Sequence, residues 1–229
     1  MGWKQYFRKT FDEEVEAGTR WGDLEPYQVT HEGKTYNTVG FVGTSSQLLF
    51  SPKIQHPQGV RTRITIKYFF WVQQGATGRA TLYIVFYKDA ETSKNPDGHD
   101  LFGVEHSIGT APETSTAFEH EFVMEYDGTN KIVWYVDGRK LGETTLEVPL
   151  VNFAVVLRIE EASGGTVGIL IYEVAAEYYD VWEDWFNMIY SAVQWMVPIM
   201  MVVMIVPMII SIIRAPSKKE EERRVVVTR

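Results

Sequence analysis

The feature that most constrains this chain is an apolar stretch near its C-terminal end, covering residues 192–213. No Asp, Glu, Lys, Arg or His occurs between Asp184 and Arg214. As an α-helix, 22 residues would be about 33 Å long, enough to cross a hydrocarbon core of roughly 30 Å. Pro198 and Pro207 would each remove a helical hydrogen bond, a defect that membrane helices tolerate as a kink. The sequence therefore predicts one transmembrane helix at this position.

The charged residues on the two sides of this stretch differ in sign. Five acids and no bases lie in residues 173–184, whereas residues 214–229 contain six bases against three acids. Lys and Arg are enriched on the cytoplasmic side of membrane proteins, so we expect the N-terminal domain outside and the tail inside. The chain as a whole has a net charge of -8. Only the basic tail is therefore suited to contact nucleic acid.

Aromatic and basic side chains around the apolar stretch are expected in the headgroup layer, which favours amphipathic rings. The residues predicted to lie at the membrane interface are Trp182, Trp185, Phe186, Tyr190, Trp195, Arg214, Lys218 and Lys219. Five methionines and two prolines would give the helix an irregular surface that adaptable side chains can fill against neighbouring protein. The predicted partners are therefore the lipid bilayer and further copies of the chain or a larger membrane assembly.

Upstream of the apolar stretch, short runs rich in Val, Ile, Thr, Tyr and Phe alternate with clusters of Gly, Pro, Asn and Asp. Within residues 61–68, polar and apolar side chains alternate, which is typical of a strand with one solvated and one buried face. The pattern predicts an all-β fold, an antiparallel jelly-roll-like β-sandwich with a C-terminal transmembrane helix. Because the chain contains no cysteine, packing alone must stabilise this domain.

The chain is expected to divide into five parts. A short helix is predicted over Lys9–Ala17, with Thr10 as its N-cap and acids in its first turn. The predicted parts are an N-terminal segment containing this helix (1–35), the β-sandwich domain (36–180), an aromatic juxtamembrane segment (181–191), the transmembrane helix (192–213) and the basic tail (214–229).

Two adjacent segments carry a resemblance to a known group of proteins. Residues 118–128 read FEHEFVMEYDG, and residues 131–141 read KIVWYVDGRKL. This pair resembles the concanavalin A-like lectin and glucanase superfamily, and the resemblance implies a jelly-roll β-sandwich. The glucanases of that superfamily carry a Glu-x-Asp-x-x-Glu strand whose carboxylates act as nucleophile and acid/base. Since no segment here has that motif, we expect a protein that is not an enzyme.

Other binding chemistry is sparse in the sequence, and no cofactor is expected. The five histidines are scattered, and no pair has metal-ligand spacing on one predicted element. Asp97 and Asp100 share a loop that offers oxygen ligands to calcium, although an ordinary acidic turn is the favoured interpretation. Trp71, Trp134 and Tyr135 are placed to stack on sugars, although alternating aromatic residues in a strand more often belong to a core.

Two functions are compatible with these observations. The first is a structural subunit of a membrane assembly at a cell surface or in a virion, favoured by the basic tail and by the lack of an Asn-x-Ser/Thr glycosylation site. The alternative is a module displayed on the cell surface for glycan binding or adhesion, which the superfamily resemblance favours. Function resides in a site rather than in a fold, so the sequence leaves both open.

Overall fold

The computed structural model describes residues 3–44, 46–57, 59–87, 101–146 and 151–214. Asp97, Asp100, Lys218 and Lys219 lie outside these described residues. The chain forms two compact units, a β domain that ends at Tyr179 and a C-terminal unit that begins at Asp180. Each unit is described by itself below.

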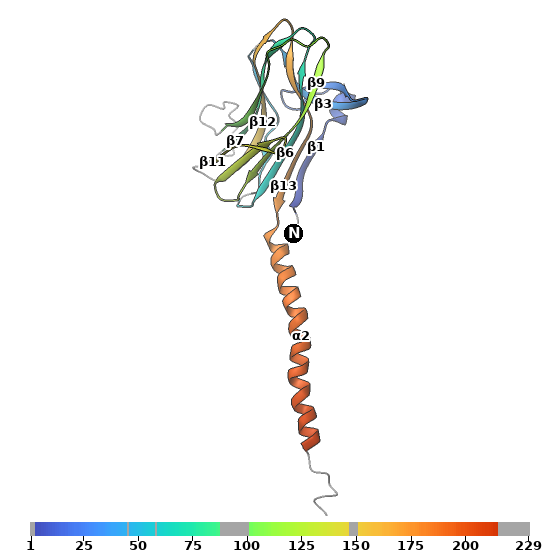
Figure 1. The fold of residues 1–229 in the computed structure, drawn as a ribbon, viewed down its shortest axis with the longest axis vertical. Coiled ribbons are helices and arrows are strands. Elements are labelled where there is room, and N and C mark those ends of the chain that lie inside the picture. Colours follow the sequence, from blue (N-terminus) through green and yellow to red (C-terminus); the bar gives the residue numbers. More distant parts are fainter. Residues whose placement is uncertain (1–2, 45, 58, 88–100, 147–150, 215–229) are drawn as a thin grey trace, which may run out of the picture. The chain divides into compact units, whose positions relative to one another are not determined.

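An eight-stranded antiparallel sheet forms the larger layer of the β domain (Figure 1). Seven strands follow one another in the order β11-β10-β9-β6-β13-β3-β2, and β1 pairs with the C-terminal half of β13. The strands are β1 (Trp3–Thr10), β2 (Glu25–His31), β3 (Lys34–Gly43), β6 (Thr62–Val72), β9 (Thr116–Tyr126), β10 (Lys131–Val136), β11 (Arg139–Thr145) and β13 (Val167–Tyr179).

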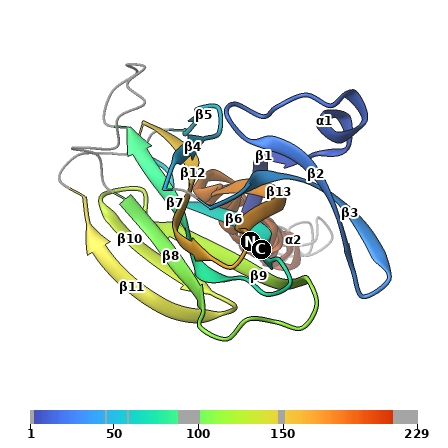
Figure 2. The ribbon, with the colours of Figure 1, turned by 90° about the horizontal axis from the view of Figure 1, so that it is seen from above.

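A five-stranded antiparallel sheet packs against the first (Figure 2). Its order is β4-β12-β7-β8, and β5 pairs with β12. The strands are β4 (Leu48–Phe50), β5 (Ile54–Gln55), β7 (Thr77–Tyr87), β8 (Leu101–Ile108) and β12 (Asn152–Ser163). The predicted antiparallel β-sandwich is therefore confirmed, because two sheets pack face to face as in a jelly roll.

The core lies between the two sheets and follows the alternation of the sequence. In β6, Ile64, Ile66 and Tyr68 have no exposed surface, whereas the intervening Arg63 and Lys67 are partly exposed. A strand points successive side chains to opposite sides, so every second side chain of β6 faces the second sheet and the side chains between them face outward. Burial of each aliphatic side chain contributes about 1.5–3 kcal/mol to folding.

The Ile66→Ala variant should lower the free energy of unfolding by about 2–5 kcal/mol, since Ile66 has no exposed surface and its removal leaves a cavity. Denaturant unfolding followed by tryptophan fluorescence measures this loss. The matched control is Thr65→Ala, on the outward side of the same strand, where we expect a change below about 1 kcal/mol. Equal losses in the two variants would contradict the assigned faces of β6.

The N-terminal segment differs from the prediction for residues 1–35. It is part of the sandwich, because β1 pairs with β13 and β2 pairs with β3. The helix α1 covers Asp12–Ala17 and is shorter than the predicted helix. Its N-cap is Phe11, without a side-chain capping bond, while the Thr10 hydroxyl donates to Asp12 at 3.3 Å. Phe11 is fully buried and packs on Trp21 at 5.1 Å between ring centroids, so packing fixes this helix start in place of a polar cap.

The C-terminal unit contains one helix, α2 (Val181–Arg214), with Pro198 and Pro207 inside it. Its apolar part, Met188–Ile210, is long and apolar enough to cross a membrane. Among the residues predicted for the interface, Trp182, Phe186, Trp195 and Arg214 lie in α2, and the described side chains of Trp185 and Tyr190 are exposed. One residue, Asp180, connects β13 to α2.

Candidate ligand-binding face

The outward side of the eight-stranded sheet carries a second side-chain cluster, separate from the core. Phe69 and Leu170 are buried there together with Val29, and Trp71 packs against them. These residues come from β6, β13 and β2, and they point away from the five-stranded sheet because they alternate with core residues. We call this side of the sheet the outer face.

One end of the outer face is aromatic. Phe69 is fully buried, and its ring lies 5.1 Å from Tyr36, 5.2 Å from Tyr172 and 5.3 Å from His31 between centroids. A hollow of about 280 Å³ opens beside this group and is lined by Tyr27, Gln28, Val29, Thr30, Val42, Trp71, Ser115, Ala117 and Leu170. Burial, followed by the charge and hydrogen bond of Glu25, raises the pKa of Tyr27 to about 12. The phenol at this end therefore remains neutral at physiological pH and donates its proton to Glu25 at 3.1 Å.

A β-bulge in β13 shapes the middle of the outer face. Ile171 pairs with Tyr68 and Glu173 pairs with Lys67, so Tyr172 is an extra residue without a partner in β6. The bulge puts both Tyr172 and Glu173 on the outer face, and Val174 returns to the core. The Tyr172 hydroxyl donates to Glu119 at 2.5 Å.

Carboxylates dominate the hollow next to this bulge. Its volume is about 370 Å³, and it is lined by Lys67, Glu119, His120, Glu121, Asp137 and Tyr172. Burial and then the hydrogen bond to Glu119 raise the pKa of Tyr172. The ammonium of Lys67 lies 3.7 Å from Glu173, whose other oxygen lies 3.3 Å from Arg8. The hollow therefore offers carboxylate acceptors next to one tyrosine ring.

The other end of the outer face is built around an arginine. Arg63 donates to one oxygen of Glu125 from Nε at 3.0 Å and from Nη2 at 2.7 Å. A third hollow of about 340 Å³ lies here, lined by Arg63, Thr65, Glu121, Val123, Glu125, Tyr135, Gly138 and Glu177. Glu121 also lines the middle hollow, so the two hollows adjoin.

A polar chain leads from the middle hollow into the space between the sheets. Asp137 accepts hydrogen bonds from His120 Nδ1 at 2.8 Å and from the backbone N–H of Glu121 at 2.9 Å. The His120 ring stacks on His106 at 4.2 Å, and His106 Nε2 shares a 2.6 Å hydrogen bond with the buried Tyr68 hydroxyl. Burial, with a smaller contribution from His120, lowers the pKa of His106 to about 4. Burial opposes ionisation of Asp137, but the two hydrogen bonds outweigh it and lower the pKa of that carboxyl.

The structure separates the three aromatic residues predicted to bind sugars. Trp71 lines the hollow beside Phe69, and Tyr135 lines the third hollow, beside Arg63. Trp134 packs instead against the core, 5.3 Å from Phe102 between ring centroids. Adjacent residues of a strand point to opposite sides, so Trp134 and Tyr135 do not share a face. Within the residues that the structure describes, no group of three His, Asp or Glu side chains is placed to hold a metal ion.

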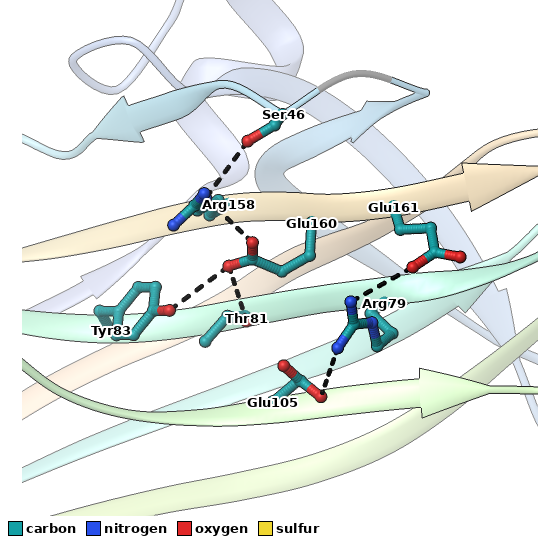
Figure 3. A network of polar contacts seen from close by, with 8 residues as sticks. All are labelled: Ser46, Arg79, Thr81, Tyr83, Glu105, Arg158, Glu160 and Glu161. Atoms are coloured by element: carbon teal, nitrogen blue, oxygen red, sulfur yellow. Dashed lines mark hydrogen bonds and ion pairs between the residues drawn. The ribbon is translucent and has the colours of Figure 1, made fainter.

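The outward side of the five-stranded sheet carries a small apolar cluster that includes Tyr87 and Val156, and beside it charged residues that are paired with one another (Figure 3). Arg79 lies between Glu105 and Glu161, at 3.7 and 3.2 Å. Glu160 lies 3.1 Å from Arg158 and accepts from the hydroxyls of Thr81 and Tyr83 at 3.5 and 3.4 Å. This network joins β7, β8 and β12 and holds their charged groups against each other.

No protein family and no curated protein matches the chain in sequence. Several solved structures are similar to it. A carbohydrate esterase from a Shiga toxin-encoding bacteriophage is 13% identical, with a TM-score of 0.47, covering 78% of this chain and 100% of its own. A GH16 protein of the Bacteroides ovatus mixed-linkage glucan PUL is 10% identical, with a TM-score of 0.44, and the two coverages are 74% and 99%.

A laminarinase catalytic domain from Thermotoga petrophila is also similar, at 15% identity and a TM-score of 0.38, covering 79% of this chain and 99% of its own. Similarity at these identities concerns the fold alone. The β-sandwich fold that the resemblance of residues 118–141 implies is the fold that the two antiparallel sheets form.

The prediction that the protein is not an enzyme needs correction. The similar structures include glucanases, a glucuronan lyase and a carbohydrate esterase. That prediction rested on the absence of one carboxylate motif from the sequence. Absence of this motif does not exclude enzymatic activity, because proteins described as having different activities share this sandwich architecture.

Proposed function

We propose that this protein is a membrane-anchored glycan-binding protein, and that the glycan lies along the outer face of the eight-stranded sheet. The observation that carries this proposal is the succession of three hollows along β6 and β9. From Trp71 to Arg63 these hollows follow eight residue steps of one strand, or about 27 Å. Such a length suits a chain of several sugar rings better than one small molecule.

The side chains of the outer face support a sugar ligand. An aromatic ring such as Trp71 packs on the apolar C–H side of a sugar ring, while hydroxyl groups at the ring edge need polar partners. Glu119 and Glu121 supply acceptors for these hydroxyls, and the Tyr27 oxygen, whose proton is donated to Glu25, supplies a further acceptor. An apolar surface with a few placed polar groups is the usual composition of a small-molecule site.

The apolar helix supports the membrane anchor. Since Met188–Ile210 is long enough to span a bilayer, we propose a single-pass protein with the β domain outside and the basic tail inside. The prediction of a structural subunit in a surface or virion-type assembly stays a prediction, since neither the fold nor the comparisons bear on it.

The glycan proposal predicts that the outer face governs affinity for polysaccharides. Full-length protein in detergent micelles should bind at least one of laminarin, mixed-linkage β-glucan and amylose in isothermal titration. Trp71→Ala and Glu121→Gln should each weaken that binding about tenfold, or about 1.4 kcal/mol, because each removes one contact with a sugar ring. The same samples, tested for released reducing ends, report whether the bound chain is also cleaved.

The matched control is Tyr83→Phe, which removes a hydroxyl from the network on the opposite sheet and should leave affinity unchanged. Binding that survives both outer-face variants would place the glycan elsewhere. Failure to bind any of the three polysaccharides, in protein that is folded by circular dichroism, would reject this proposal for neutral glucans.

A further inference from the structure

The end of the β domain that joins α2 carries a group of aromatic rings and guanidinium groups. Trp3 and Tyr179 are paired across β1 and β13, and their rings meet edge to face at 5.7 Å. The guanidinium of Arg63 lies 4.4 Å from the centroid of the Trp3 ring, and that of Arg61 lies 5.3 Å from it. Arg61 also lies 5.9 Å from the Tyr179 ring. We call these four residues the basal patch.

We propose that the basal patch binds phospholipid headgroups of the membrane that α2 spans. This inference rests on the proposed membrane anchor. The patch shares Arg63 with the third hollow of the outer face, so the variants that test it are at Trp3 and Arg61, which line none of the three hollows. The patch would be a second attachment, formed by the β domain itself, which holds that domain on the bilayer surface.

Chain length limits how far the patch can be from the bilayer. Tyr179 precedes α2 by one residue, and the apolar part of the helix begins at Met188. The seven helical steps from Val181 to Met188 rise about 10 Å, and the two steps from Tyr179 to Val181 add a few ångströms, whereas the headgroup layer is roughly 5–7 Å thick on each side. With an upright helix, Tyr179 would therefore lie a few ångströms above the headgroups. A tilt of the helix would lower this height and bring the patch into contact with them.

The composition of the patch fits a headgroup. Indole and phenol rings favour the boundary between water and hydrocarbon, and arginine forms charge-assisted hydrogen bonds with phosphate. The Arg61 side chain is half exposed, and its contact with Glu125 is long, at 3.7 Å. Arg63 is bound closely by the same carboxylate at 2.7 Å. Arg61 is therefore the residue best placed to exchange its carboxylate partner for a lipid phosphate.

The charges around the patch indicate which lipids it takes. Glu125 lies between the two arginines, and Glu177 pairs with Arg63 across the strands. Lys4 and Asp180, next in sequence to Trp3 and Tyr179, add one charge of each sign, so three bases and three acids leave this region without net charge. Attraction to an anionic surface is thus not the source of binding, and zwitterionic phosphatidylcholine should suffice.

The absence of cysteine from the chain allows a direct test with single fluorescent labels. Gln5→Cys places a label on β1 beside the patch, and Thr114→Cys places one at the opposite ends of β6 and β9. Full-length protein is inserted in phosphatidylcholine nanodiscs whose headgroups carry a nitroxide quencher. We expect strong quenching at position 5 and at least threefold less at position 114.

The patch itself is tested by Arg61→Gln and Trp3→Ser in the position 5 background. Each should lower quenching at least twofold, because the domain then lifts from the surface while α2 stays inserted. Trp3→Phe, which keeps an aromatic ring, should retain most of the quenching. The control Arg79→Gln alters an arginine on the other sheet and should change nothing.

Unchanged quenching in both patch variants would overturn the inference, since the covalent link to α2 alone would then hold the label at position 5 near the headgroups. A twofold rise in quenching when phosphatidylglycerol replaces phosphatidylcholine would contradict the neutral charge balance. If the protein does not enter nanodiscs at all, the membrane anchor fails, and the basal patch with it. None of these outcomes alters the glycan titration.

Discussion

Acidification from pH 7 to 4.5 should remove several kcal/mol from the free energy of unfolding of the β domain. His56 is buried and His106 is partly buried, both in the neutral form, and burial lowers the pKa of each to about 4. Each would bind a proton near pH 6.5 in the unfolded chain, so the unfolded state gains protons first as pH falls. Stability is therefore full above about pH 6.5 and is lost as pH falls towards 4.

The shift at His56 corresponds to about 3 kcal/mol, and that at His106 to less, because His106 is only partly buried. Together they approach the whole stability of a typical domain. Denaturant titrations at half-unit pH steps, kept at or above pH 4.5, measure the slope. Asp127 and Asp137 stay ionised in that range, because hydrogen bonds outweigh burial and lower the pKa of each.

His56→Gln isolates one of the two contributions. An amide at this position can still bond the Thr62 hydroxyl, which His56 Nε2 contacts at 2.6 Å, but it cannot take up a proton. We expect this variant to lose about half of the pH dependence. A slope equal to that of the original protein would show that His56 is not the titrating group.

Deletion of Tyr172 should abolish most glycan binding while the β domain still folds. Tyr172 is the unpaired residue of the bulge, so its removal leaves Ile171 opposite Tyr68 and Glu173 opposite Lys67. The ladder of β13 then continues without a change of register. What disappears is the ring that packs on Phe69 and Tyr36 and the hydroxyl that binds Glu119. We expect affinity to fall more than tenfold and the free energy of unfolding by about 1–3 kcal/mol.

The other sheet supplies a matched deletion. The pairing of β12 with β7 shifts between Ile159 and Glu161, so Glu160 is the corresponding extra residue. Its deletion removes the centre of the network in Figure 3 and should leave glycan affinity unchanged. Circular dichroism and amide exchange show whether each variant is folded. If the Tyr172 deletion variant is unfolded, the argument that β13 keeps its pairing with β6 is wrong. If the variant is folded and keeps full affinity for the glycan, the bulge has no role in binding.

The sequence predicts strands where β-branched and aromatic residues cluster, most clearly where burial also alternates. In β6, Ile64, Ile66 and Tyr68 are recognisable because they alternate with Arg63, Thr65 and Lys67. β1 and β8 escape prediction because they contain few of the β-branched residues that mark the other strands. The sequence of β1, WKQYFRKT, has no β-branched residue before its last position, and in β8, LFGVEHSI, only Val104 and Ile108 are β-branched. Pairing with β13 and β7 makes these segments strands.

The site is less predictable than the fold, because it depends on neighbours distant in sequence. Phe69 and Tyr172 meet only through the pairing of β6 with β13. One signal of the bulge is present in the sequence of β13. Apolar core residues fall at Ile169 and Ile171 and then at Val174 and Ala176, a change from odd to even positions. This shift indicates a bulge once the strand is known, but not which residues lie beside it.

The direct connection of β13 to α2 has a mechanical consequence. A ligand that pulls on the β domain while the helix is held would load β13 first, because Asp180 is the only residue between them. β13 is an inner strand, bonded to β6 along eleven residue pairs on one side and to β3 and β1 on the other. A force along its axis would be shared by many of these bonds at once instead of breaking them one after another. The strand that carries the bulge is thus also the one best suited to transmit tension between an external polymer and the membrane.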